Sequence, residues 1–170
     1  MLYHLLISFY PQFSREMILL EDDDLGVACK PAGLPTTPAR DQHRFHMQGY
    51  LERHYGAAVH TPSRLDTAVS GLLLFSRSSR GNRWCQRAQE RRLVEKLYVC
   101  EVSGRPKTRL LDIRRPLARD ERHPVLRRAV ETGGEEAWTR ISVLCDSPTA
   151  SRSVLQAQPF TGRTHQIRVH

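Results

Sequence analysis

The sequence predicts an α+β domain, built on a mixed, mostly antiparallel sheet that is flanked by helices. Three observations lead to this prediction. Strand-like runs outnumber helical segments, only two clear helices stand among them at irregular places, and turn residues separate the runs. A parallel sheet would instead need a regular alternation of strands and helices. The length of 170 residues suits one domain with a substantial core.

The first third of the chain predicts a hairpin, a loop and a helix. Residues 17–20 and 25–29 are short apolar runs around an acidic stretch, a pattern typical of a hairpin with a polar turn. Prolines and a glycine in residues 30–35 then favour a constrained loop. Apolar residues at helical spacing predict an amphipathic helix over residues 41–55.

A buried strand and a basic helix are expected next. Residues 70–75 become continuously apolar after a glycine, which favours a buried strand. A serine at position 78 or 79 can cap a helix that runs to about residue 93. We expect its inward face to carry Trp84, Cys85 and Ala88, while arginines cover the other face.

The second half predicts three more strands. These are residues 96–102, 139–145 and 153–158, and in the second of them Ile141, Val143 and Cys145 are expected to share one face. Between the first two, residues 114–128 are basic and interrupted by prolines, so we expect irregular structure there.

Composition favours a basic, soluble protein of a reducing compartment. The net charge is +8, and arginine greatly outnumbers lysine, which suits contacts with phosphate and stacking on bases. Taken alone, this charge is equally compatible with a solvated surface. No apolar run is long enough for a membrane helix, so we expect no membrane association.

The four cysteines lack the C-x-x-C spacing of zinc sites, so we predict no metal. Cys29, Cys100 and Cys145 lie in apolar runs and are expected to be buried free thiols. Free thiols indicate a reducing compartment, and we therefore expect a cytoplasmic location.

Three segments carry residues suited to chemistry on a nucleic acid. Arg64 and Asp66 lie on a polar turn before the strand at 70–75, where a carboxylate is both fixed and accessible. Tyr98, two residues after Lys96, can stack on a base. Residues 161–170 form a basic segment in which Thr164 can cap a helix. Each segment also has a plain interpretation: a surface ion pair, a half-buried strand tyrosine, and a basic terminal segment.

Together, these segments resemble the RluA-type family of pseudouridine synthases. The family pattern H-R-L-D-x-x-T-S-G-L-L-L-F is matched by residues 63–75, with Ser63 in place of histidine and Val69 in place of threonine. The family's T-G-R-T-H-Q-I-R-V-H signature matches residues 161–170 without a change, and its K-x-Y strand matches residues 96–98. Its K-P-A-G-L loop matches residues 30–34.

The resemblance implies a pseudouridine synthase fold and a set of site residues. The catalytic set would be Asp66 as the carboxylate, Tyr98 against the target base, and Arg168 as the ion-pair partner of the carboxylate. The RNA-binding set would be Arg64, Arg163, His165 and Lys30, with Arg64 entering the RNA stack as the uridine flips out. No cofactor and no metal are implied.

The function implied is that of an isomerase which converts a specific uridine in tRNA or rRNA to pseudouridine, acting as a monomer with RNA as its partner. Residues 1–16 would be a leader or an extra strand, and residues 17–170 a catalytic domain incomplete at its C-terminal end. That incompleteness leaves an alternative, a catalytically inactive RNA-binding protein of the same fold. A basic scaffold with no RNA role is a third interpretation.

Overall fold

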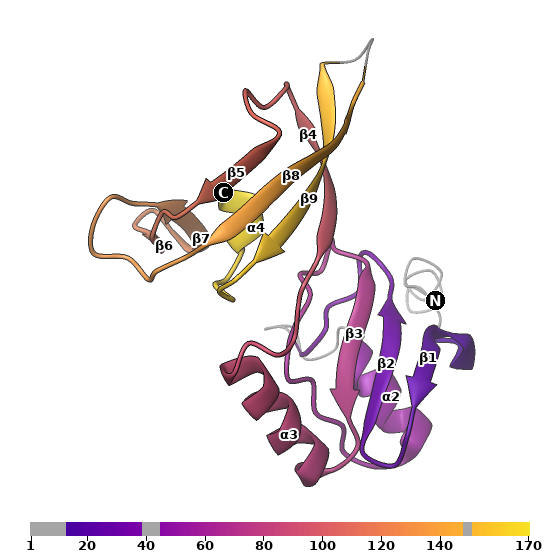
Figure 1. Cartoon of the computed structure of the whole chain (residues 1–170). Helices are drawn as coiled ribbons and strands as arrows, with labels where there is room; N and C mark the ends of the chain where they lie inside the picture. The colour runs from indigo at the N-terminus through magenta and orange to yellow at the C-terminus, as the bar shows by residue number, and fades with distance from the viewer. Residues whose placement is uncertain (1–12, 39–44, 148–150) are drawn as a thin grey trace, which may run out of the picture. The chain divides into compact units, whose positions relative to one another are not determined.

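The computed structural model describes residues 13–38, 45–147 and 151–170, so residues 1–12 of the predicted leader lie outside the described residues. The chain divides into two compact units, Met1–Leu93 and Val94–His170, and each is described by itself. Figure 1 labels the helices and strands of both units. All strand pairings in the described residues are antiparallel, where the sequence predicts a mixed, mostly antiparallel sheet.

The first unit is built on a three-stranded sheet in the order β1-β2-β3. Its strands are β1 (Ile18–Glu21), preceded by the short 3-10 helix η1 (Arg15–Met17), then β2 (Leu25–Lys30) and β3 (Gly71–Ser76). The turn between β1 and β2 is closed by the Asp22 carboxylate, which accepts hydrogen bonds from the backbone of Asp24 and Leu25 at 2.8 and 2.7 Å. An aspartate is well suited to such a turn, and the predicted acidic hairpin is confirmed.

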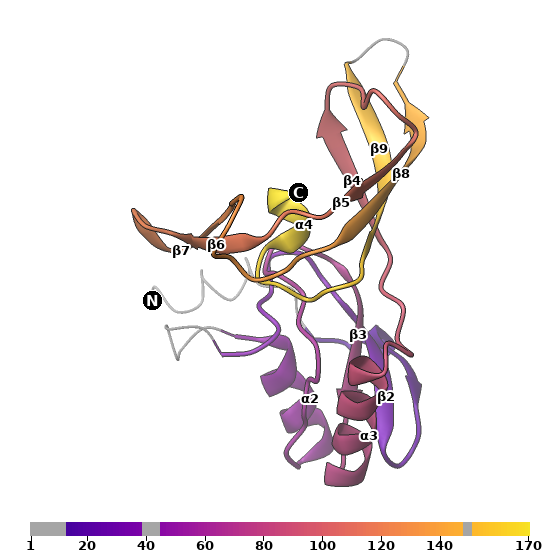
Figure 2. The ribbon, with the colours of Figure 1, turned by 60° about the vertical axis from the view of Figure 1, so that its left-hand side comes forward.

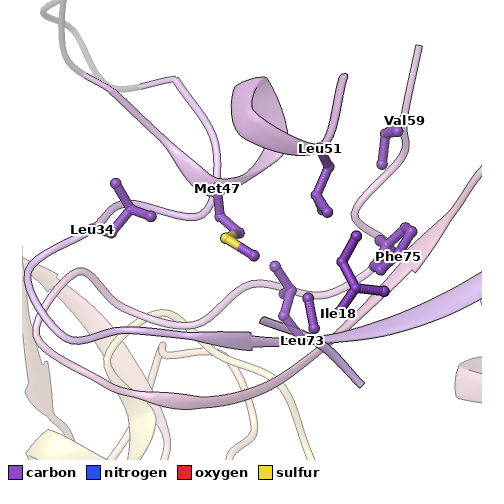
Figure 3. Packing of buried hydrophobic residues seen from close by; sticks show 8 residues of the cluster. Ile18, Leu34, Met47, Leu51, Val59, Leu73 and Phe75 are labelled. Atoms are coloured by element: carbon purple, nitrogen blue, oxygen red, sulfur yellow. The ribbon is translucent and has the colours of Figure 1, made fainter. Parts of the chain in front are cut away.

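Helix α2 (Met47–Tyr55) supplies the main core of this unit together with β2 and β3. The helix begins at His46, whose Nδ1 accepts a hydrogen bond from Gly49 N at 3.0 Å, and it ends at Gly56 with a φ of 64°. Figure 3 shows how its buried side chains meet those of the sheet and the connecting loops. The helix lies within the predicted range of 41–55, whose first residues fall outside the described part.

Helix α3 (Ser79–Glu90) lies along β3 and begins where the sequence predicts, with the Ser78 hydroxyl accepting from Gly81 N at 3.0 Å. A Cβ atom at Gly81 would lie 2.6 Å from the Asp24 carbonyl oxygen, so glycine allows the helix to approach the hairpin. Cys85 and Ala88 are buried as predicted. The prediction that Trp84 faces inward is wrong, because Gly81 takes that position and Trp84 remains 57% exposed.

The second unit holds a four-stranded sheet in the order β4-β9-β8-β5. Its strands are β4 (Tyr98–Ser103), β9 (Arg152–Pro159), β8 (Thr139–Asp146) and β5 (Leu110–Ile113). The buried core of this sheet consists of Ile141, Leu155 and Ala157. Ile167 of the short helix α4 (Gln166–Val169) packs against that core.

A two-stranded hairpin, β6 (Leu117–Asp120) and β7 (His123–Ala129), occupies the segment that the sequence predicts to be irregular. Figure 2 shows this hairpin as a ribbon separate from the main sheet of the unit. The prediction is wrong because most of the hairpin's side chains remain in solvent, so apolar and polar residues do not alternate along it.

The cysteines are free thiols, but only some of them are buried. Cys85 is buried and Cys100 is half-buried, whereas Cys29 and Cys145 are exposed, which contradicts the prediction for these two. Cys29 follows Ala28 on β2 and therefore points to the other face of the strand. At Cys145 a register shift after Val143 breaks the alternation, so Cys145 no longer shares the buried face of Ile141.

Candidate active site

The predicted catalytic carboxylate, Asp66, lies on a hydrogen-bonded turn in the first unit. The Asp66 carbonyl oxygen accepts from Val69 N at 3.0 Å, and the chain then enters β3 through Gly71 at a φ of 136°. A side chain would be strained at this φ, so glycine suits the entry to the strand. Asp66 is half-buried, and its neighbour Arg64 is exposed. The turn thus holds the carboxylate at the end of a rigid strand.

The loop that follows β2 clamps this turn from the side. The Thr36 hydroxyl donates to the Leu65 carbonyl at 2.8 Å and accepts from Leu65 N at 3.0 Å. Gly33 N donates to the Thr67 carbonyl at 2.7 Å, with Gly33 in a left-handed conformation at a φ of 85°. The residues on both sides of Asp66 are therefore fixed by contacts with one loop.

Lys30 completes the clamp from inside the protein. Its side chain is fully buried, and its ammonium group donates to the carbonyl oxygens of Pro31 at 3.0 Å, Leu34 at 2.7 Å and Thr67 at 3.4 Å. Burial lowers the pKa of Lys30, and the negative charge of Asp66 opposes that shift. The sequence-based assignment of Lys30 to RNA contact is therefore corrected: a fully buried ammonium group does not reach a phosphate, and Lys30 positions the turn instead.

Tyr98, the first residue of β4, lies in the second unit. It pairs with Ala157 of β9, and its half-buried ring packs against the core of that sheet. Lys96, two residues earlier, is also half-buried, and its burial lowers its pKa. The pairing with β9 fixes the backbone of Tyr98, so its ring has a defined position in this unit.

Gln166 organises the segment 161–170, and the sequence did not reveal this role. Its buried side-chain oxygen accepts from the Thr161 hydroxyl at 2.8 Å and from Arg163 N at 3.0 Å. Its side-chain nitrogen donates to the Trp138 carbonyl at 3.0 Å and to the Thr139 hydroxyl at 2.9 Å. All four bonds of one amide are thus made, and they tie the segment to β8.

The two RNA-binding candidates of this segment flank the amide. Arg163 is exposed, and its guanidinium group donates to the Glu136 carbonyl at 2.8 Å and pairs with Glu135 at 3.0 Å. His165 is half-buried and adopts a left-handed backbone with a φ of 57°. RNA contact by these two residues stays a prediction.

Helix α4 is a single turn that carries Arg168 on its exposed side. The predicted cap at Thr164 is wrong: the helix begins after His165, whose left-handed backbone takes the capping position without a side-chain hydrogen bond. The ring of His170 contacts the Thr139 hydroxyl at 2.9 Å and the Arg115 carbonyl at 3.0 Å. These contacts attach the end of the turn to the unit, a role that the sequence did not indicate.

The structure therefore brings some of the predicted residues together and leaves others in separate units. Lys30 and Asp66 lie at one turn of the first unit, whereas Tyr98 and Arg168 belong to the second. The ion pair between Asp66 and Arg168 stays a prediction. Within the described ranges, no three His, Cys, Asp or Glu residues form a metal-binding group. Nor does any helix in those ranges have the length and apolar character needed to span a membrane.

Comparisons with known proteins identify the family of this chain. A sequence profile described as "RNA pseudouridylate synthase" matches residues 24–170. An uncharacterized RNA pseudouridine synthase of Bacillus subtilis (strain 168), YhcT, is 30% identical over 168 residues, covering 96% of this chain and 55% of the relative. The dual-specificity RNA pseudouridine synthase RluA of Escherichia coli (strain K12) is 33% identical over 166 residues, covering 94% of this chain and 73% of the relative.

Among solved structures, human RNA pseudouridylate synthase domain containing 1 matches with a TM-score of 0.74 at 22% identity, covering 95% of this chain and 66% of that one. This likeness shows the α+β fold of a pseudouridine synthase domain, as predicted. The matched profile and the relatives go further: the chain belongs to the RNA pseudouridylate synthase family, and within it to the RluA type. It spans about half the length of the Bacillus relative.

Proposed function

We propose that this chain carries the catalytic carboxylate of an RNA pseudouridine synthase, which isomerises a specific uridine in tRNA or rRNA. The observation that supports it most is the clamped turn at Asp66. Hydrogen bonds to the backbone of Leu65 and Thr67 fix the chain on both sides of Asp66, and the residue remains half-buried rather than covered. A fixed and accessible carboxylate is what an attack on a sugar carbon requires.

The reaction breaks the C1′–N1 bond of uridine, turns the uracil and forms a C1′–C5 bond. The proton lost from C5 is balanced by the proton that N1 carries in the product. Asp66 would attack C1′ or stabilise the positive charge that develops on the sugar. An ion pair with Arg168 would favour the charged carboxylate. The isomerisation has no net redox change, and we propose that it needs neither a cofactor nor a metal.

The RNA would be held by the remaining predicted residues. Tyr98 offers an aromatic face for a uridine that has flipped out of its stack. Arg64 is exposed one residue before the clamp and would take the place that the uridine leaves in the RNA. Arg163 and His165 would contact phosphate. We propose a monomer acting in the cytoplasm, which suits four cysteines that are all free thiols.

The decisive experiment is incubation with total tRNA and rRNA from a host that lacks pseudouridine synthases, followed by mapping of pseudouridine. We expect new sites with the unmodified chain and none with Asp66→Asn. New sites made equally well by Asp66→Asn would refute the role of Asp66. RNA binding by the unmodified chain without any new site would instead support the inactive RNA-binding alternative.

A further inference from the structure

Helix α3 carries an exposed row of arginines with an indole at its edge. Four residues form it, and we call them the α3 basic face: Arg83, Trp84, Arg87 and Arg91. Positions three and four apart on a helix lie on one side, so Arg87 lies next to both Arg83 and Trp84. Arg91, at the C-cap, continues the row by a further turn. From Arg83 to Arg91 the face extends about 12 Å, given a rise of about 1.5 Å per residue.

The packing of the first unit does not use this face. The helix attaches through its other side, where Gly81, Cys85 and Ala88 are buried. A separate arginine, Arg80, pairs with Asp24 and anchors the start of the helix. Within the described ranges, by contrast, no ion pair involves an arginine of the α3 basic face.

The chemistry of the face fits one kind of partner. A guanidinium group binds phosphate through two parallel hydrogen bonds, and an exposed indole stacks on an unpaired base. Trp84 is 57% exposed although it is among the largest apolar side chains, and Arg87 lies beside it, one turn further along the same side of the helix. An apolar protein partner would need a wider apolar patch, whereas the phosphates and bases of a single strand match a row of cations beside one aromatic ring.

We propose that the α3 basic face binds a single-stranded segment of the substrate RNA, separate from the nucleotide that reacts at Asp66. Its arginines contact phosphates and Trp84 stacks on one base. The inference rests on the proposed function, since it extends the binding of the same RNA. It adds a second point of attachment that contributes to affinity without touching the reacting sugar.

Fluorescence of Trp84 gives a direct test. The chain has two tryptophans, so a Trp138→Phe background leaves Trp84 as the only indole. We expect saturable quenching by an oligouridylate of about 12 nucleotides and weaker quenching by a blunt RNA duplex, whose bases are already stacked. Absence of quenching at oligouridylate concentrations that saturate binding to the chain, measured by anisotropy of labelled RNA, would overturn the proposal.

A charge-matched pair of variants separates the face from net charge. Arg83→Gln/Arg87→Gln removes two charges from α3, and Lys107→Gln/Arg152→Gln removes two from exposed positions of the second unit. We expect the first double variant to weaken oligouridylate binding about tenfold and to reduce the slope of log K against log salt by about 1.4. The second double variant should leave the affinity and the salt slope nearly unchanged. Equal losses in the two would mean that only net charge matters, which would overturn the proposal.

Turnover distinguishes this inference from the proposed function. We expect Arg83→Gln/Arg87→Gln to raise the RNA concentration needed for half-maximal rate while the rate at saturation stays the same. If the unmodified chain forms pseudouridine and this variant forms it at every RNA concentration with the same rate, the inference fails and the proposed function stands. If the unmodified chain forms none although RNA quenches Trp84, the proposed function fails and the binding face stands.

Discussion

The two units hold their candidate residues in different ways. In the first, the turn of Asp66 is fixed by several groups: a hydroxyl and a backbone N–H of the loop after β2, and the buried ammonium group at the end of β2. In the second, one buried amide, that of Gln166, makes four bonds that fix the segment before Arg168. A support shared among several groups should tolerate single changes better than a support that depends on one side chain.

The largest effect is expected at that amide. Gln166→Leu would remove four hydrogen bonds of one buried side chain, those with Thr161, Arg163, Trp138 and Thr139, and each contributes about 0.5–1.5 kcal/mol. We expect a loss of about 3–5 kcal/mol in the free energy of unfolding, measured by urea denaturation. Hydrogen exchange should accelerate in β8 and β9. Gln86→Leu, at an exposed position of α3, is the control and should change the free energy by less than about 0.5 kcal/mol.

A smaller effect is expected at Thr36, because several groups hold the turn of Asp66 and the loss of one leaves the others in place. Thr36→Val keeps the shape and removes both hydrogen bonds to Leu65. We expect a loss of about 2–3 kcal/mol and a lower rate of pseudouridine formation, since the turn of Asp66 loosens. Thr36→Ser retains the hydroxyl and should restore most of the rate. A loss as large as that of Gln166→Leu would contradict the comparison between the units.

The buried charge of Lys30 leads to a prediction of how the stability of the chain depends on pH. Its pKa in the folded state lies below the ordinary value of 10.5, so between the folded pKa and 10.5 the unfolded chain binds more protons. The contribution of Lys30 to the free energy of unfolding therefore becomes more favourable as the pH rises through that window. Lys30→Met removes this contribution. We expect the stability of the unmodified chain relative to Lys30→Met to increase as the pH rises toward 10.5, measured by urea denaturation.

Two controls keep this pH experiment specific. Tyr55, whose pKa is raised to about 12, begins to act in the opposite direction above pH 10, but it is present in both chains and cancels. Lys107→Met, at an exposed lysine, should show no such trend. A difference between the unmodified chain and Lys30→Met that stays flat across the range would show that the Lys30 pKa is not lowered.

The smallest effect is expected at an exposed ion pair between strands of the second unit. Arg152 and Glu101 approach to 2.7 Å, and their side chains are 62% and 56% exposed. Glu101→Gln should reduce stability by less than about 0.5 kcal/mol, because solvent screens the pair. A loss above about 1 kcal/mol in urea denaturation would mean that surface charges, and not Gln166, hold this sheet together.

The sequence revealed the elements with strong local signals. The hairpin around Asp22 and the start of α3 at Ser78 were predicted because a turn aspartate and a capping serine act on their own neighbours. The hairpin at 117–129 was missed because its exposed strands lack alternation. The role of Gln166 was missed because its four partners lie on segments distant in sequence, or at its own turn, and an amide has no local signature.

For Lys30, the sequence did contain a signal for burial, but the charge of the side chain suggested exposure instead. Lysines are exposed in most proteins, and a basic chain suggests RNA contact for each of them. The period of two in β2 nevertheless places Lys30 on the same face as the buried Gly26 and Ala28. Three carbonyl oxygens, those of Pro31 and Leu34 in the loop and of Thr67 in the turn, accept from its ammonium group and make this burial possible. The strand period predicted the position of the side chain better than its charge did.

The main-chain clamp around Asp66 has a practical consequence. The bonds to Leu65 and Thr67 use no atom of the Asp66 side chain, so Asp66→Asn should preserve the shape of the turn. Such a variant would hold its RNA without converting it. Ultraviolet crosslinking and sequencing of the captured RNA would then turn this chain into a substrate trap, one that reads out the target uridine in living cells.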